Sequence, residues 1–158
     1  MSSSASSPRR TRRARRRSSP SGASARSASP KRSTMNCLDS SVVIDVLDGE
    51  ETVVDALEEH DDPFYAPTIV RSEVLEGLLA GWFDGADAGQ SLSWLRSLGF
   101  TREAALEAAH VRMEFRRDGE TIPDADTFIA GVVRANGATL ITQDAHFERV
   151  EGINVAVL

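Results

Sequence analysis

Apolar residues recur along residues 35–158 in two rhythms. Short apolar runs bounded by Asp, Pro or Gly predict four strands, which are residues 36–39, 63–67, 138–144 and 153–158. Apolar residues three and four apart predict helices between them, which are residues 41–49, 51–60, 68–83, 86–99, 101–119 and 124–136. Strands separated by helices predict an α/β fold, in which a parallel sheet carries helices on both faces.

The first 34 residues differ from the rest in composition. They hold ten basic residues and twelve Ser, but no acid and no Val, Ile, Leu or aromatic residue. Such a segment has no apolar surface to bury, so we expect a disordered basic extension. It is interpreted as dispensable, arising from a start codon assigned upstream of Met35, or else as an arm that binds nucleic acid. No apolar run follows the arginines, which argues against a twin-arginine export signal.

The remaining part of the chain is strongly acidic. Residues 35–158 hold eight arginines, no lysine and all 24 acids, which gives a formal charge of −16. This composition resembles that of extreme halophiles, where concentrated salt screens the repulsion between surface carboxylates.

Cys37 is the single cysteine, so no internal disulfide exists. With no signal peptide and no long apolar span, we expect a cytoplasmic protein without membrane contact.

Four acids stand at positions where a charge does not help folding. Asp39 and Asp144 end predicted strands, and strand ends on one side of a parallel sheet form the usual ligand site. Glu73 lies beside the apolar stripe of its helix, and Asp126 opens the last helix. Each acid alone has a structural explanation as a cap or a solvated charge. In a simple doubly wound sheet, a right-handed crossover would put Asp126 at the other edge, unless its helix enters from the central groove.

Convergence of four carboxyl groups would require a counter-charge. Without one, mutual repulsion raises the pKa values of the acids and weakens the fold. All-oxygen sites suit Mg²⁺ or Mn²⁺, which also bind phosphate oxygens. The three histidines lack the spacing of metal ligands, and the chain has no Gly-rich phosphate loop.

The stretches "LDSSVVIDVL", "SEVLEGLL", "DADTFIAGVVRANGATLITQD" and "HF" together resemble a PIN domain of the VapC type, a toxin ribonuclease. The resemblance spans residues 35–158. It implies a PIN-like three-layer fold, whose central parallel sheet of about four to five strands is flanked by helices. It also implies that the last helix starts at the central groove. Carried over position by position, the catalytic and metal-binding acids are Asp39, Glu73, Asp126 and Asp144.

The same resemblance separates the two aspartates of the last helix. Asp126 is assigned to the metal, and Asp124, which follows Pro123, is the better candidate for the helix cap. The alternative is that Asp124 reaches a second metal or a bound water. Ser40 and Thr142 are supporting residues, whose hydroxyl groups either hold a carboxylate or water or pair with backbone.

The function that the resemblance implies is a Mg²⁺- or Mn²⁺-dependent endoribonuclease, the toxin of a type II toxin–antitoxin pair. The expected partners are an RNA substrate, a small antitoxin and a second copy of the chain. Trp94 and Leu95 would supply part of the homodimer face or belong to the core. One alternative is a non-catalytic PIN-like RNA-binding module. The other is a phosphatase, since "DADT" resembles the DxDx[TV] motif of haloacid-dehalogenase-type phosphatases, although their motif ends the first strand and they rely on a lysine.

Overall fold

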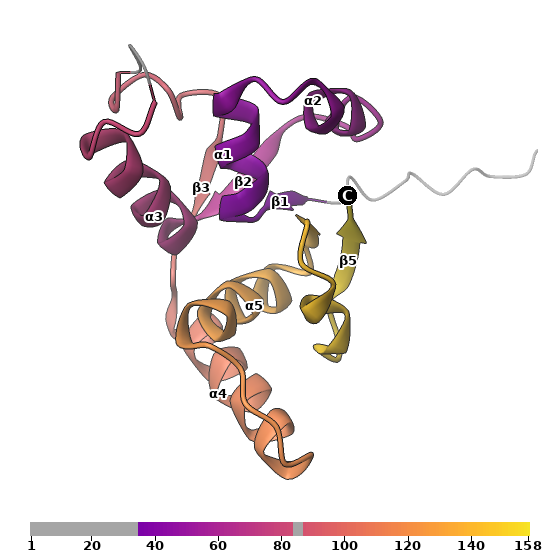
Figure 1. Cartoon of the computed structure of the whole chain (residues 1–158). Helices are drawn as coiled ribbons and strands as arrows, with labels where there is room; N and C mark the ends of the chain where they lie inside the picture. The colour runs from indigo at the N-terminus through magenta and orange to yellow at the C-terminus, as the bar shows by residue number, and fades with distance from the viewer. Residues whose placement is uncertain (1–34, 84–86) are drawn as a thin grey trace, which may run out of the picture. The chain divides into compact units, whose positions relative to one another are not determined.

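The structure is a computed structural model, and it describes residues 35–83 and 87–158 (Figure 1). The described residues all fall within one compact unit. The disordered extension predicted for residues 1–34 lies outside them. Along the two described stretches, no helix is both long enough and apolar enough to cross a bilayer.

The described residues form strands and helices in alternation. The strands are β1 (Asn36–Leu38), β2 (Phe64–Pro67), β3 (Arg96–Leu98), β4 (Thr139–Thr142) and β5 (Asn154–Val157). The α-helices are α1 (Ser40–Asp48), α2 (Glu51–Leu57), α3 (Thr68–Leu79), α4 (Arg102–Arg117) and α5 (Asp124–Asn136), and a 3-10 helix, η1 (Ala145–Arg149), follows β4.

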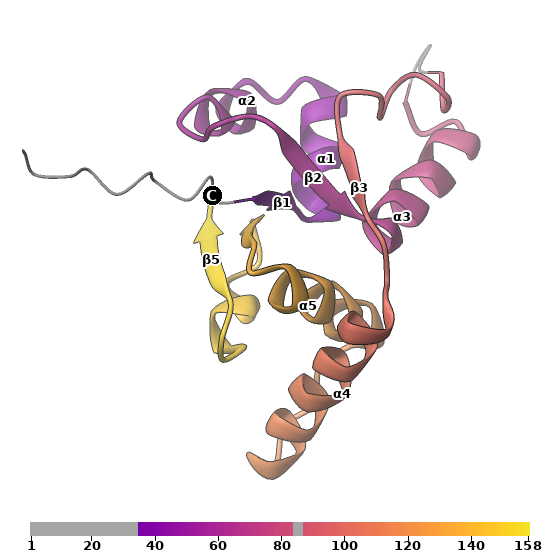
Figure 2. The same ribbon diagram turned by 180° about the vertical axis from the view of Figure 1, so that it is seen from behind.

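The strands form one parallel sheet in the order β3-β2-β1-β4-β5. From β1 the chain moves outward to β3, and it then returns past β1 to β4 and β5. Right-handed crossovers in these two directions place their helices on opposite faces of the sheet. Figures 1 and 2 show α1, α2 and α3 around the half of the sheet that holds β2 and β3, with α4 packed along α5. The predicted three-layer α/β fold with a parallel sheet is confirmed.

The two central strands are buried because helices cover both faces of the sheet. Cys37 and Leu38 of β1 and Leu140 and Ile141 of β4 have no exposed surface. Burial, followed by the nearby charge of Asp39, raises the pKa of the Cys37 thiol to about 12. Cys37 is therefore an inert core residue, as its apolar surroundings in the sequence predict.

The helix predicted over residues 86–99 is wrong. Residue 86 lies outside the described residues, residues 88–94 form turns, and β3 follows at the edge of the sheet. Arg71 of α3 donates to two carbonyl oxygens of this segment at 3.2 Å each, so tertiary contacts satisfy backbone groups that a helix would pair internally. Two of the three residues of β3 are exposed. An edge strand of this kind has no apolar alternation by which it could be recognised.

Helices α4 and α5 approach each other most closely at Gly131. A Cβ atom there would lie 2.5 Å from the carbonyl oxygen of Ala104 and 2.7 Å from the Cβ of Ala108. Cβ atoms in real proteins essentially never lie so close to another heavy atom. A flexible side chain could move away, but the backbone of α4 could not. The absence of a side chain at Gly131 is therefore what lets these two helices pack at this distance.

Gly131→Ala is expected to lower the melting temperature. Alanine normally stabilises a helix interior by roughly 0.5–1 kcal/mol relative to glycine, but overpacking against the backbone of α4 costs about 1–3 kcal/mol. Gly77→Ala of α3 is the matched control, because the three atoms nearest its methyl group would all belong to the ring of Trp82, which is 66% exposed, and not to backbone. Thermal unfolding followed by circular dichroism measures both variants. A Gly131→Ala protein as stable as wild type would contradict the close packing.

Candidate functional site

The carboxyl ends of β1 and β4 meet at the centre of the sheet, where the chain reverses its direction of winding. Asp39 directly follows β1, and its backbone N–H donates to the carbonyl oxygen of Ile141 at 3.0 Å. Asp144 lies two residues beyond the end of β4. Ligands of parallel sheets bind at this kind of reversal, in the crevice outside the strand ends. The topology thus puts these two acids where a ligand site is expected.

Both acids also have the structural role that Asp commonly plays. Asp39 is the N-cap of α1, and its Oδ1 accepts from the N–H of Ser40 at 2.8 Å. Asp144 is the N-cap of η1, and its Oδ1 accepts from the N–H of His146 at 2.8 Å. Capping fixes the direction of each carboxyl group relative to the sheet. The capping and functional explanations are therefore compatible.

Thr142 connects the two acids through one hydroxyl group. Its side chain is fully buried, and the hydroxyl donates to Oδ2 of Asp39 at 2.8 Å. The same oxygen accepts from the N–H of Asp144 at 3.0 Å. Together with Ser40, Thr142 orients both oxygens of the Asp39 carboxylate. Of the two supporting residues, Thr142 binds a carboxylate through its hydroxyl, whereas Ser40 does so through its backbone N–H.

The start of α5 reaches the same edge of the sheet. Gly137, in the left-handed conformation with φ 59°, ends α5, and β4 begins at Thr139. The helix therefore runs back along the sheet from the start of β4. Its 13 residues span roughly 20 Å, more than the roughly 13 Å of a four-residue strand. Of the two placements considered from the sequence, the opposite edge is wrong, and the start of α5 lies at the same edge as the ends of β1 and β4.

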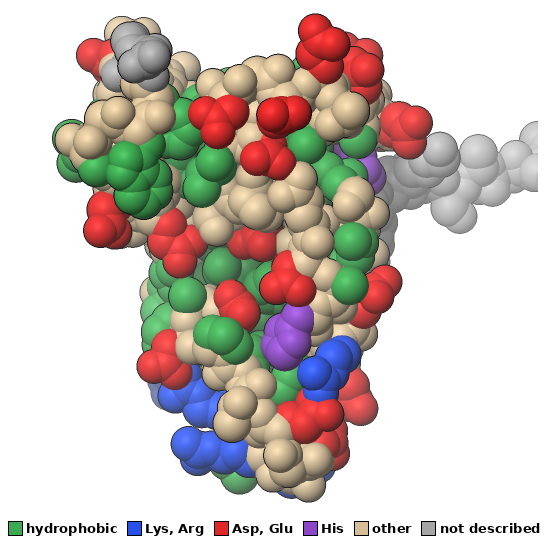
Figure 3. All heavy atoms as spheres, in the orientation of Figure 1, with side chains coloured by type: hydrophobic (Ala, Val, Ile, Leu, Met, Phe, Trp, Pro, Cys, Tyr) green, Lys and Arg blue, Asp and Glu red, His purple; other side chains and the backbone are tan. Residues whose placement is uncertain are grey.

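The charges of three acids act on Asp126 at this edge. The pKa of the Asp126 carboxyl is raised, first by burial and then by the negative charges of Asp39, Asp144 and, more weakly, Glu73. The pKa of Asp39 is also raised, mainly by burial, although its hydrogen bonds from Thr142 and Ser40 oppose the shift. Figure 3 shows several acidic side chains on the face between the α1–α3 and α4–α5 parts. Acids from four segments thus share one electrostatic environment.

Asp124 does not join this group. The N-cap of α5 is Pro123, and no side chain caps the helix, so the prediction that Asp124 caps it is wrong. The Asp124 carboxylate is 79% exposed and accepts from Arg112 of α4 at 2.6 Å. Residues two apart on a helix point about 200° apart, so Asp124 and Asp126 face different sides. The Asp124 side chain is accordingly directed to α4 and not to the acids of the groove.

Two contacts at this edge were missed from the sequence. The side-chain amide of Gln143 donates to Oδ2 of Asp45 at 2.6 Å, which ties α1 to the segment after β4. His146 lies near enough for its charged form to lower the pKa of Asp126, and its ring packs on Phe115 with centroids 5.5 Å apart. Its Nε2 is buried without a hydrogen-bond partner among the described residues. The only sequence signal for either contact is proximity to Asp144 along the chain.

The donor chemistry of the groove fits a divalent cation. Asp39, Glu73, Asp126 and Asp144 offer only carboxylate oxygens, the donors that Mg²⁺ and Mn²⁺ prefer. The neighbouring negative charges raise the pKa of Asp126, and a bound cation would neutralise them. Within residues 35–83 and 87–158, no three His, Cys, Asp or Glu side chains already stand together as ligands of one ion. The role of the four acids as ligands stays a prediction.

Asp126→Asn is expected to stabilise the metal-free protein at neutral pH. Because folding raises the pKa of Asp126, wild type loses stability as the pH rises from about 4 through the raised value, and the loss is complete above it. The variant escapes this loss, so near pH 7 in EDTA its Tm should be higher than that of wild type. Below about pH 4 the two proteins should match.

Calorimetry from acid to neutral pH at constant salt measures this difference. Asp124→Asn is the control, because it removes a nearby charge but also breaks the ion pair with Arg112, so no gain is expected. An Asp126→Asn protein less stable than wild type at pH 7 would be inconsistent with unfavourable charge at this site.

Comparison with known proteins supports the same architecture. The sequence profile of the family described as "PIN domain" matches residues 37–153. No curated protein matches the chain at a significant level. Among solved structures, VapBC2 from Rickettsia felis, bound to a DNA fragment from its promoter, is similar with a TM-score of 0.67 and 19% identity, over 78% of this chain and 98% of that chain.

Two further structures are similar to the same extent. DNA-bound VapBC from Salmonella typhimurium has a TM-score of 0.65 and 21% identity, over 78% of this chain and 98% of that chain. FitAcB from Neisseria gonorrhoeae has a TM-score of 0.66 and 24% identity, over 77% and 96%. At these identities the likeness concerns the fold, whereas the profile covers most of the chain and all four acids. The chain belongs to the PIN domain family, a family of nucleases, and its fold is of the VapC type.

Proposed function

We propose that this protein is a metal-dependent endoribonuclease that hydrolyses phosphodiester bonds in RNA. The proposed ligands and catalytic groups are Asp39, Glu73, Asp126 and Asp144, with Mg²⁺ or Mn²⁺ as the cofactor. The observation that supports this most directly is that the charges of the other three acids act on the half-buried Asp126. A member of a nuclease family has a clear use for such an arrangement, since acids that repel one another are tolerated when an ion binds them.

In this proposal, the chain positions oxygen ligands and the ion supplies the chemistry. A bound ion would lower the pKa of water and stabilise charge on the phosphate. Asp39 would be the most rigid ligand, because Thr142 and Ser40 hold its two oxygens. Thr142 would act as a positioning residue, since its hydroxyl also holds the backbone of Asp144. The tie between Gln143 and Asp45 would restrain the same segment.

High salt is the proposed working condition. The formal charge of −16 on residues 35–158 repels RNA in dilute buffer, and molar salt shortens the Debye length to roughly 3 Å. Salt also weakens ordinary ionic binding of RNA. Contacts that pass through a bound ion would then contribute more to substrate binding than they do in a basic nuclease.

The phosphatase alternative is not supported. In the phosphatases that it resembles, the "DADT" motif ends the first strand, whereas here it opens α5. Asp124, the first acid of the motif, is paired with Arg112 at the surface.

The purified protein is expected to cleave RNA in high salt with Mg²⁺ or Mn²⁺, and EDTA should stop the reaction. Loss of a ligand should remove several kcal/mol of transition-state stabilisation, so Asp39→Asn and Asp126→Asn should each lower kcat by about 100-fold or more. Gel analysis of a structured RNA measures the rate. If either variant cuts at the wild-type rate, the assigned site is wrong.

Two matched pairs make this test specific. Glu73→Gln should lose activity while Glu76→Gln, an exposed acid on the same helix, should keep it. Asp126→Asn should lose activity while Asp124→Asn keeps its kcat within about threefold, a difference of less than 1 kcal/mol. If Asp126→Asn and Asp124→Asn lower kcat equally, Asp124 also belongs to the metal site.

We further propose that the chain is the toxin of a type II pair, with a small antitoxin as its partner and a homodimer as its state. The support is that similar solved structures are VapBC complexes, and one is named a toxin–antitoxin complex, from Klebsiella pneumoniae. Trp94, which is 39% exposed, remains available for a dimer face, whereas Leu95 is buried in the core.

Co-expression with the product of a short adjacent reading frame should abolish cleavage and yield a stable complex. If no adjacent product binds, the toxin assignment fails while the nuclease assignment stands.

A further inference from the structure

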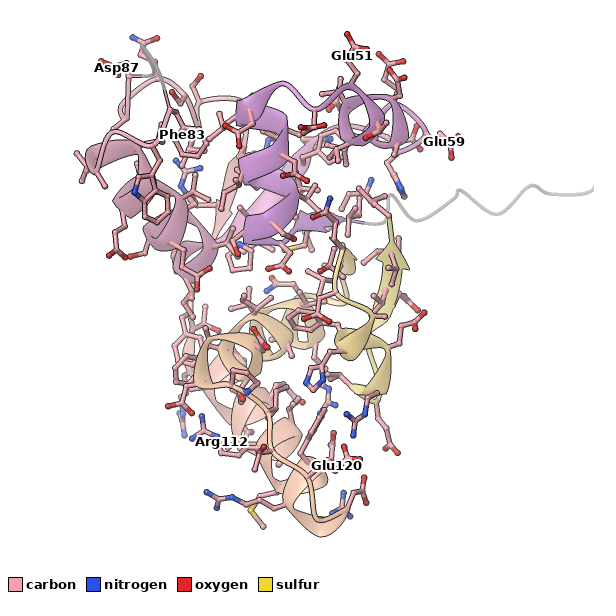
Figure 4. The ribbon with its side chains drawn as sticks, viewed as in Figure 1. Glu51, Glu59, Phe83, Asp87, Arg112 and Glu120 are labelled. Carbon is pink, nitrogen blue, oxygen red and sulfur yellow. The ribbon has the colours of Figure 1, made fainter. Side chains whose placement is uncertain are left out.

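Half of the arginines of the folded part lie on α4. Residues 35–158 hold eight arginines, and four of these, Arg102, Arg112, Arg116 and Arg117, belong to this helix. Figure 3 shows basic side chains in the lower part of the face, on the α4–α5 side. Figure 4 places the labelled Arg112 there, far from Glu51 of α2 and from Glu59, which follows that helix. Half of the few positive charges of residues 35–158 therefore lie on one helix.

An aromatic pair lies beside one of these arginines, Arg112. Phe100 precedes α4, and Phe128 belongs to α5. Their ring centroids are 5.1 Å apart, with an interplanar angle of 66°. Phe100 is 41% exposed, so its ring is not fully used by the core. The guanidinium carbon of Arg112 lies 5.8 Å from the centroid of the Phe128 ring. We call Phe100, Phe128 and Arg112 the aromatic platform.

The aromatic platform begins close to the acids of the groove. Phe128 follows Asp126 by two positions, which is roughly 3 Å along the axis of α5 but on the other side of the helix. The helix with its side chains is about 10 Å across. A strand of nucleic acid that crosses the first turn of α5 therefore passes from Asp126 to the aromatic platform within a few nucleotides.

We propose that the aromatic platform binds an unpaired base of the RNA a few nucleotides from the cleaved bond, and that Arg112 binds its phosphate. This inference rests on the proposed nuclease function. Unstacked bases bind to aromatic rings and to guanidinium planes, and such contacts accept all four bases. The aromatic platform would thus favour single-stranded over duplex RNA.

Arg112 has the donors for this contact. A guanidinium carries five N–H donors, and the bond to Asp124 uses one terminal nitrogen. Arg112 itself is about one third exposed, and its exposed partner Asp124 competes with a phosphate for it. Phosphate binding would exchange one anionic partner of Arg112 for another, so no buried charge is left unpaired.

A second copy of the chain is the other occupant to consider. Leu106 and Met113 on α4 are 58% and 53% exposed, so a protein partner would have reason to cover the length of that helix. RNA would contact only the aromatic platform. Leu106→Ala therefore distinguishes the two occupants.

The test is fluorescence anisotropy of a labelled single-stranded RNA of about 12 nucleotides, in Mg²⁺ and high salt. The full chain carries Asp126→Asn so that the RNA is not consumed. Adding Phe100→Leu should weaken binding about tenfold, whereas Phe100→Tyr, which keeps a ring, should bind within about twofold. Leu106→Ala should leave the affinity unchanged, and the blunt duplex of the same sequence should bind more weakly than the single strand.

The outcomes separate this inference from the nuclease proposal. If wild type cleaves RNA but Phe100→Leu binds the single strand as well as its parent, the aromatic platform is not a base site. If no cleavage occurs with any metal and binding still depends on Phe100, the nuclease proposal fails and the platform stands. If Phe100→Leu and Leu106→Ala both change the sedimentation coefficient and the affinity, the surface joins two copies and the inference is overturned. Circular dichroism confirms that each variant is folded.

Discussion

Negative charges confined at the carboxyl edge of the sheet are the constraint on which the site depends. The central strands place Asp39 and Asp144 there because β1 and β4 are neighbours, and α5 adds Asp126. Burial and repulsion raise the pKa of Asp126. At neutral pH its charge therefore lowers the stability of the fold. One buried hydroxyl, that of Thr142, orients Asp39 and holds the backbone of Asp144. Such order among groups that repel one another is what a cation-binding function would require.

The few arginines of the folded part have different roles. Arg134 of α5 donates to both carboxylate oxygens of Glu114 on α4, at 3.1 and 2.8 Å, and to the backbone of Glu151. This contact holds the pKa of Glu114 below its usual range and links α4, α5 and the segment before β5. Arg71 supports the turns before β3. Of the arginines of α4, Arg112 pairs with Asp124, which places a positive charge beside the first residue of α5.

Most of the elements could be predicted from the sequence, because their signals are local. The stops at Gly49 and Gly137 are αL C-caps, and Thr101 caps α4 by accepting from the N–H of Ala104. The largest exception is the segment that contains β3, and the helix predicted over residues 68–83 also ends early, at Leu79. The residues of the β3 segment lack an apolar alternation, and its conformation depends on pairing with β2 and on Arg71, which lies far away in sequence. Local patterns carry no information about contacts of that kind.

The sequence by itself determined the alternation of strands and helices and the parallel sheet, and it singled out the four candidate acids. Only the tertiary structure decided where those acids lie relative to one another. It placed the start of α5 at the carboxyl edge of the sheet, and it directed Asp124 to Arg112 and away from Asp126. The physical reason is that propensity and periodicity act within a few residues, whereas the direction of a carboxyl group is decided by its burial, its hydrogen bonds and the charges of distant segments.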